Sequence, residues 1–335
     1  MTTNPNIHRN LSQTAQVATC PEIEQLFYEF EEALKQFGIP IQPGSELEGA
    51  YFSVRELMGK NQDVHICDPQ EDIRHGFREV LGIWVFLRQI VRLKDHVSFS
   101  TFVPHLTLLN KGTVVQNMRV QLSQEATNKI FELLFAVALL DLSDEVVLDH
   151  PSSAKGDNPD VLATIDGQCW GFACKTIYGS SGKTFYDNLK KGVEQIEAAP
   201  KAQVGTVVMN FRNIINHDKC WPILNEAEYR NGAEPRFAAY DRPEEFVREY
   251  ISEVVTQKHR QVVDEIGLPN IMKLFSGKKA LPGYLAYCPT CTGRNTVYGP
   301  APRSINMLSV GEFGNLQAHQ GIIEKINSAL HECSR

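Results

Sequence analysis

The sequence lacks any apolar run long enough to cross a membrane. Its longest such run, Leu133 to Leu140, falls far short of the ~18 residues that a membrane-spanning helix requires. The first residues, Met1 to Asn6, are polar and differ from the apolar stretch of a secretory signal. We therefore expect a cytoplasmic protein without a membrane partner.

Paired cysteines and excess positive charge are missing as well. The eight cysteines are spread over the chain, and only Cys288 and Cys291 have CxxC spacing, which argues against a disulfide scaffold. The formal net charge of −7 weighs against a uniformly basic surface for nucleic acid, although it permits a local basic groove. The ten histidines show neither HExxH spacing nor a Ser-His-Asp arrangement, so we assign no catalytic role to His75, His96 or His105.

The composition that remains is that of an ordinary globular protein, with 42% hydrophobic and 22% charged residues over 335 positions. Residues 1–19 are polar and are predicted to form a disordered tail. Residues 20–119 are predicted to form a mainly helical N-terminal domain, because apolar residues recur at helical spacing over 20–37 and 71–94. This domain serves either as a scaffold and oligomerisation surface or in specific recognition.

Residues 120–335 are predicted to form a second domain with a core, 124–213, and a C-terminal extension, 214–335. Within the core the patterns predict a helix, three strands, a second helix and a fourth strand. In the extension, strands over 281–287 and 304–310 are expected to continue the same sheet.

Two neighbouring strands of the core carry residues suited to phosphodiester chemistry. The segments on either side of Asp166 and Gly167 are rich in strand-forming residues, and Asp-Gly between such segments predicts a tight hairpin. Side chains alternate along a strand, so this hairpin can hold the carboxylate of Asp160 close to the ammonium group of Lys175.

The hairpin resembles the signature of the PD-(D/E)xK nuclease superfamily. That signature has Pro-Asp on one strand, here Pro159 and Asp160, and an acid, any residue and lysine on the next, here Ala173, Cys174 and Lys175. The resemblance implies an α/β fold with a restriction-endonuclease-like mixed sheet flanked by helices, here preceded by the N-terminal helical domain.

The resemblance also implies a metal site. Asp160 would be the main metal ligand, Glu132 on the preceding helix an accessory ligand, and the backbone carbonyl of Cys174 a third. Lys175 would orient the attacking water or stabilise charge on the phosphoryl oxygens, and Gln195 stands where many members place a supporting glutamine. Oxygen ligands of this kind suit Mg²⁺, with Mn²⁺ as a substitute. On the residues alone, a structural role for Glu132 comes first and a functional role is the alternative, because a carboxylate in an apolar helix needs some partner.

Ala173 departs from the signature, because a methyl group cannot bind a metal. Two explanations are open: the site is naturally degenerate, or alanine replaces a natural acid and the sequence is that of an inactive variant. An acid on the following helix does not fill the gap, since Asp187 and Glu194 are expected to face solvent.

The glycine-rich loop from Gly179 to Thr184 lacks Walker spacing, because Ile177 stands where that motif needs its first glycine. The loop can still bind phosphate through backbone N–H groups at the start of a helix. Lys183, Lys190 and Lys191 are therefore candidate nucleic-acid contacts, with solvated surface charges as the alternative.

A second set of residues has the spacing of a metal site. His217 and Cys220 share the offset of Cys288 and Cys291, so the four side chains are candidates for a tetrahedral zinc site. The alternative is that the cysteines are reduced structural thiols.

These features predict a Mg²⁺-dependent endonuclease that hydrolyses phosphodiester bonds in DNA, with a role in restriction or anti-phage defence. DNA is the expected partner, and self-association into a homodimer is a further prediction. The alternative is a non-catalytic nuclease-fold subunit that binds nucleic acid or a protein partner. An unrelated α/β protein, in which Pro-Asp and Lys175 occur by chance, is a third interpretation.

Overall fold

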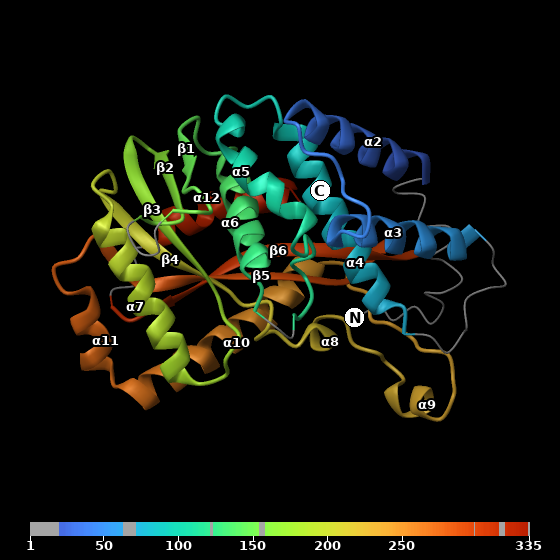
Figure 1. The fold of residues 1–335 in the computed structure, drawn as a ribbon. Coiled ribbons are helices and arrows are strands. Elements are labelled where there is room, and N and C mark those ends of the chain that lie inside the picture. The colour runs from blue at the N-terminus through green and yellow to red at the C-terminus, as the bar shows by residue number, and fades with distance from the viewer. Residues whose placement is uncertain are drawn as a thin grey trace.

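The computed structural model describes residues 20–62, 72–120, 123–153, 158–297, 299–314 and 319–333, so the predicted tail over 1–19 lies outside the described residues. A six-stranded mixed sheet runs through the molecule, with helices on both faces (Figure 1). The strands lie side by side in chain order: β1 (Val146–Leu148), β2 (Val161–Ile165), β3 (Gln168–Thr176), β4 (Val204–Asn210), β5 (Ala280–Thr296) and β6 (Gly299–Glu312). The predicted α/β class and mixed sheet are confirmed.

The sheet combines both strand directions. β1, β2 and β3 are antiparallel neighbours, β3, β4 and β5 are parallel, and β5 and β6 are again antiparallel. Parallel neighbours need a crossover, and α7 (Gly182–Ala198) supplies it between β3 and β4. With α6 (Glu125–Leu139) before β1, the predicted order of helix, three strands, helix and strand is confirmed, as is the continuation of the sheet by two C-terminal strands.

The hairpin between β2 and β3 closes through Asp166 and Gly167, whose φ angles are 53° and 75°. Positive φ at both positions is what a type I′ turn requires, and its twist matches that of the strands. The register pairs Val161 with Phe172, which sets the start of β2 beside the middle of β3, so that the last residues of β3 lie next to the segment that contains Asp160.

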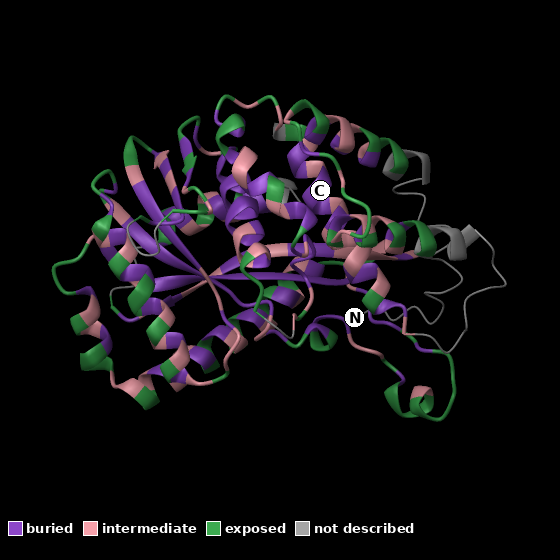
Figure 2. Cartoon of the chain, in the orientation of Figure 1, coloured by how far each residue is buried: buried purple, intermediate pink, exposed green. Residues whose placement is uncertain are grey.

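Each face of the sheet is covered by its own set of helices. α6 and α12 (Gln320–Cys333) pack on one face, where Phe135 meets Phe172 with ring centroids 5.3 Å apart. α7, α10 (Pro243–Ile266) and α11 (Leu268–Phe275) cover the other, where Phe185 meets Tyr284 at 4.8 Å. Figure 2 shows that the strands between these layers are largely buried.

The N-terminal part is helical, as predicted, and packs on the α6 side of the sheet (Figure 1). It consists mainly of α2 (Cys20–Gln36), α3 (Glu46–Gln62) and α4 (Arg74–Leu93). Its apolar side chains join those of α6 and the sheet in one continuous core. Arg74 ties α4 to the C-terminal half, because it donates a 2.6 Å hydrogen bond to the carbonyl of Trp221.

Short helical segments complete the fold: η2 (Phe99–Phe102), α5 (Val103–Leu106), η3 (Thr107–Asn110), α8 (His217–Cys220) and α9 (Glu226–Arg230). Across the described ranges, no helix has both the length and the apolar character that a membrane crossing requires.

Candidate active site

Asp160 and Lys175 meet where β2 begins and β3 ends. Nζ of Lys175 lies 3.0 Å from Oδ2 of Asp160, and the same oxygen accepts a 2.7 Å hydrogen bond from the backbone N–H of Cys174. Lys175 also donates to the carbonyl oxygen of Cys174 at 2.8 Å. Asp160 is 5% exposed, so the pair is shielded from bulk water. The hairpin thus brings together the two side chains that the sequence placed there.

α6 brings a second carboxylate to the same place. Glu132 is 5% exposed, and its Oε2 atom lies 2.9 Å from Nζ of Lys129, one turn earlier on the helix. The same Nζ atom lies 3.8 Å from Oδ1 of Asp160. Lys129 therefore stands between the two carboxylates, and each of the candidate metal-binding side chains already faces an ammonium group.

Burial dominates the ionisation of this cluster. It raises the pKa of Glu132 to about 8, with help from the charge of Asp160 and against the opposing effect of Lys129. Burial alone would lower the pKa of Lys129, but Glu132 and Asp160 hold that pKa above its usual range. The cluster thus combines a firmly protonated Lys129 with a carboxyl group that can take up a proton near neutral pH.

His105 closes one side of the cluster. Its Nε2 atom lies 3.6 Å from Oε2 of Glu132, and among the described residues neither ring nitrogen has a hydrogen-bond partner. Burial, and then the charge of Lys129, lower the pKa of His105 to about 3. His105 is therefore neutral, and its position beside Glu132 was not predicted from any local pattern.

Ala173 lies on β3 and is fully buried on the side of the sheet that α7 covers. A Cβ atom built on Gly192 of α7 would lie 3.3 Å from the Ala173 methyl group and 2.7 Å from Val207. The helix can approach the sheet this closely because both positions are small. A longer acidic side chain at position 173 would point into this packed contact.

Gln195, the predicted supporting residue, also lies on α7. Its Oε1 atom is buried and has no hydrogen-bond partner within the described part of the chain. The hydrogen bonds of Asp160 and Lys175 involve other groups. Asp187 and Glu194 are exposed, as predicted.

The glycine-rich loop already holds an anion from the protein itself. The carboxylate of Glu265 on α10 accepts a 2.9 Å hydrogen bond from the backbone N–H of Lys183, and the N–H of Gly182 also stabilises its charge. Lys258 donates to the carbonyl of Ser180 at 2.5 Å. A phosphate at this helix start would have to displace Glu265.

The three lysines proposed for nucleic-acid contact, Lys183, Lys190 and Lys191, are all exposed on α7. Lys190 lies 3.9 Å from Glu194. Their contact with a nucleic acid remains a prediction.

The candidate zinc residues do not present free ligands. Nε2 of His217 donates to the carbonyl of Arg212 at 2.8 Å, which leaves Nδ1 to accept from Thr290 at 3.2 Å. Cys291 accepts a 3.0 Å hydrogen bond from Asn117. Cys220 and Cys288 are buried thiols whose pKa values burial raises. Within the described ranges, no group of three or more His, Cys, Asp or Glu side chains is arranged to hold a metal ion.

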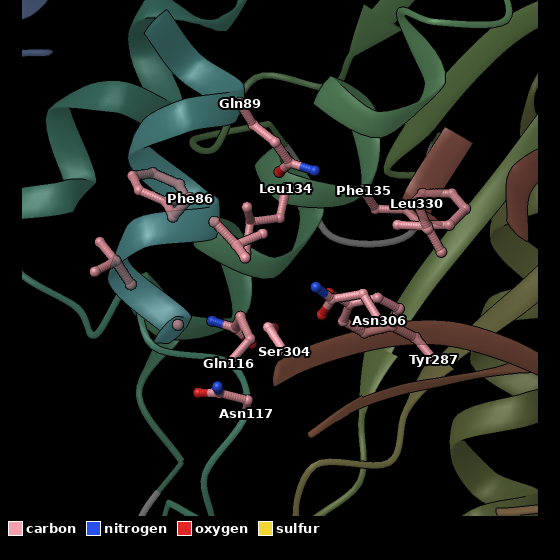
Figure 3. A pocket seen from close by; sticks show the side chains of 13 residues that line it. Phe86, Gln89, Gln116, Asn117, Leu134, Phe135, Tyr287, Ser304, Asn306 and Leu330 are labelled. Atoms are coloured by element: carbon pink, nitrogen blue, oxygen red, sulfur yellow. The ribbon is translucent and has the colours of Figure 1, made fainter. Parts of the chain in front are cut away.

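A small cavity lies at the seam between α4, α6, β5, β6 and α12 (Figure 3). Its volume of about 20 Å³ is enough for a water molecule but far too small for a nucleotide. Amide side chains of Gln89, Gln116, Asn117 and Asn306 face an apolar wall that includes Phe86 (Figure 3). Among the described residues, no carboxylate, lysine, arginine or histidine lines this cavity, so the charged cluster at Asp160 is the better candidate for chemistry.

Sequence reasoning missed Lys129 as a member of the site. A signal was present, because residues three apart on a helix share a face and Lys129 precedes Glu132 by three positions.

The chain matches no protein-family model, and comparisons with curated proteins and with solved structures found no significant match.

Proposed function

We propose that this protein is a Mg²⁺-dependent endonuclease of the PD-(D/E)xK type that hydrolyses phosphodiester bonds in DNA. The observation that carries the proposal is the 3.0 Å contact between Asp160 and Lys175, with Glu132 reaching the same cluster from α6. The order of α6, β1, β2, β3, α7 and β4 is the restriction-endonuclease-like order, which supports the proposal. A role in restriction or anti-phage defence follows by analogy.

The donor set fits a hard divalent cation. Asp160 and Glu132 offer carboxylate oxygens, and Cys174 offers a backbone carbonyl oxygen. This carbonyl lies near Asp160, because Nζ of Lys175 donates hydrogen bonds to both groups. The position of Lys129 between the two carboxylates supports a cation site there. When bound there, Mg²⁺ would lower the pKa of a water molecule and neutralise charge on the phosphoryl group.

The protein's own groups would then do the positioning. Lys175 is held by Asp160 and the Cys174 carbonyl, so its remaining N–H can orient a water molecule or stabilise a phosphoryl oxygen. Neutral His105 and the apolar surface of α6 limit access of bulk water, which strengthens each electrostatic contact. Gln195 would act as a polar support on α7.

A second candidate function is a nuclease-fold subunit that binds nucleic acid or a protein partner without cutting. Two observations favour it. The position that the signature assigns to an acidic ligand holds Ala173, which is packed against α7. The carboxylates of Asp160 and Glu132 are already paired with ammonium groups. In this form the two lysines would attract a phosphate without activating water.

Incubation of supercoiled plasmid DNA with the protein and Mg²⁺ tests the proposal. Cleavage that is abolished by EDTA and by Asp160→Ala, but kept by Asp264→Ala, is the expected result. Asp264 is a matched control because it is an exposed aspartate on α10, on the other face of the sheet. Circular dichroism must show that both variants are folded. Plasmid left intact by the folded wild-type protein, with DNA binding retained, would favour the non-catalytic subunit.

A further inference from the structure

A basic pocket lies where α4, the segment before α6 and the start of α8 meet. It has a volume of about 210 Å³ and is lined by His75, Arg78, Met118, Arg119, Asn216, His217 and Asp218. We propose that this pocket binds a backbone phosphate of the DNA strand that is cut, close to the scissile phosphate. This inference rests on the proposed nuclease function and adds a substrate-binding site to it.

Arg119 is held in place by its neighbours. Its own Nε atom donates to the carbonyl of Ile215 at 3.1 Å, and the carbonyl of Met118 accepts from Arg212 at 2.8 Å. The N–H of Val120 donates to the side chain of Asn213 at 2.8 Å. Three consecutive residues are thus fixed to the turn that follows β4. A fixed guanidinium group loses little entropy when it binds phosphate, and its two terminal nitrogens remain available.

Arg78 adds a second guanidinium group from α4. It is 8% exposed, yet its Nε atom has no hydrogen-bond partner among the described residues. Its Nη2 atom pairs with Asp218 at 2.8 Å, and the same carboxylate lies 3.8 Å from Arg74. Arg74 has a closer partner of its own in Asp72, at 2.6 Å, so Asp218 mainly neutralises Arg78. Arg119 takes part in no ion pair within the described ranges. The pocket carries excess positive charge in a chain whose net charge is −7.

The pocket lies on the same edge of the sheet as the catalytic cluster. Asn213, which holds Val120, also donates to the carbonyl of Ile177 at 3.2 Å. Ile177 follows Lys175 by two residues, just past the end of β3. A strand with its scissile phosphate at Asp160 and Lys175 can therefore place a nearby phosphate at Arg119. The glycine-rich loop offers no such free site, because Glu265 already occupies it.

The test is DNA binding without cleavage. Fluorescence anisotropy of a short fluorescein-labelled duplex in EDTA would compare the wild-type protein with Arg119→Ala and Arg260→Ala. Arg260 is a matched control because it is an exposed arginine on α10, on the opposite face of the sheet from α4. Arg119→Ala is expected to bind about five- to tenfold more weakly and to reduce the slope of log K against log salt by about 1. Arg260→Ala should stay within about twofold of wild type.

The outcomes separate this inference from the proposed function. If folded Arg119→Ala binds the duplex as tightly as wild type, the pocket is not a phosphate site, whatever the protein does to plasmid DNA. If wild type fails to bind the duplex, inorganic phosphate titrated in isothermal calorimetry provides the second arm. Heat of binding that Arg119→Ala loses would keep the pocket as a site for free phosphate and overturn the DNA substrate, whereas no heat would overturn both.

Discussion

Replacement of Lys129 by methionine should raise the affinity of the site for a divalent cation. Nζ of Lys129 lies 3.8 Å from Asp160, which corresponds to roughly 4 kcal/mol of attraction at an effective dielectric constant of about 20. It lies 2.9 Å from Glu132, which adds roughly 6 kcal/mol when Glu132 is ionised, a state that its pKa of about 8 favours only at alkaline pH. A cation that binds both carboxylates must first displace this ammonium group. Hydration of the displaced group offsets most of the loss, so we expect a net gain of about 1.4 kcal/mol or more, which is tenfold in Kd. Methionine keeps the length and the apolar stem without the charge.

Isothermal titration of Mn²⁺ into the wild-type protein, Lys129→Met and Lys190→Met measures this effect. Lys190 is the control because its side chain is 54% exposed and lies on α7. Without metal, Lys129→Met should also lose thermal stability, since Glu132 loses its partner, and added Mn²⁺ should restore it. A variant that binds Mn²⁺ no more tightly than wild type would show that Asp160 and Glu132 do not form the metal site.

Two further predictions concern stability. Ala173→Glu should lower the free energy of unfolding by at least about 2 kcal/mol in urea denaturation, because the new side chain meets α7 at Gly192. An unchanged urea midpoint would show that position 173 has room for a glutamate side chain. Burial, partly offset by the hydrogen bond to Arg212, lowers the pKa of His217 from 6.5 to about 4, so the folded state binds fewer protons than the unfolded state. The stability that neutral His217 contributes is complete above pH 6.5 and is lost as the pH falls toward 4, by on the order of 3 kcal/mol. His217→Gln should therefore flatten that part of the profile of unfolding free energy against pH, measured by urea titration. An equally steep profile in the variant would contradict the assignment of His217 as neutral in the folded protein.

The core of the fold was predictable because its elements have simple patterns. α6 and α7 show helical periodicity, β4 is a β-branched run, and Asp-Gly marks the hairpin turn. α3 was missed because its apolar residues do not form one stripe: Phe52 is 57% exposed, and Gly49 lowers the helix propensity of the segment. Such a helix is stabilised by tertiary packing rather than by its own pattern.

β5 and β6 are longer than the predicted strands. The prediction was too short because both strands contain prolines, which normally end a strand. Leu308 of β6 donates its N–H outward to Asn327 at 2.6 Å, so the backbone N–H positions an even number of residues away from it also face away from β5. Pro302 is one of these, and its missing N–H costs no ladder hydrogen bond. Pro289 pairs with Asn306, another outward position, beyond the part of β5 that pairs with β4. These exceptions depend on register, which the sequence alone does not reveal.

The candidate site was predictable to the extent that it depends on local spacing. Alternation along the hairpin predicted the meeting of Asp160 and Lys175, and the family resemblance pointed to Glu132. The interaction of Glu265 with the glycine-rich loop joins positions 82 residues apart, so no local pattern could show it. The same holds for the hydrogen bonds of His217, whose partner Thr290 is 73 residues away.

The balance of charge in the cluster connects the two proposed functions. With Glu132 ionised, two carboxylates face Lys129 and Lys175, and the side chains sum to zero; with Glu132 protonated, the sum is +1. Such a cluster can attract a phosphate group without any metal, but it lacks a group that would activate water. A divalent cation adds two charges, which the cluster can hold only if Lys129 moves away from Glu132 and Asp160. The two proposed functions therefore differ in how easily one buried lysine, Lys129, leaves its place.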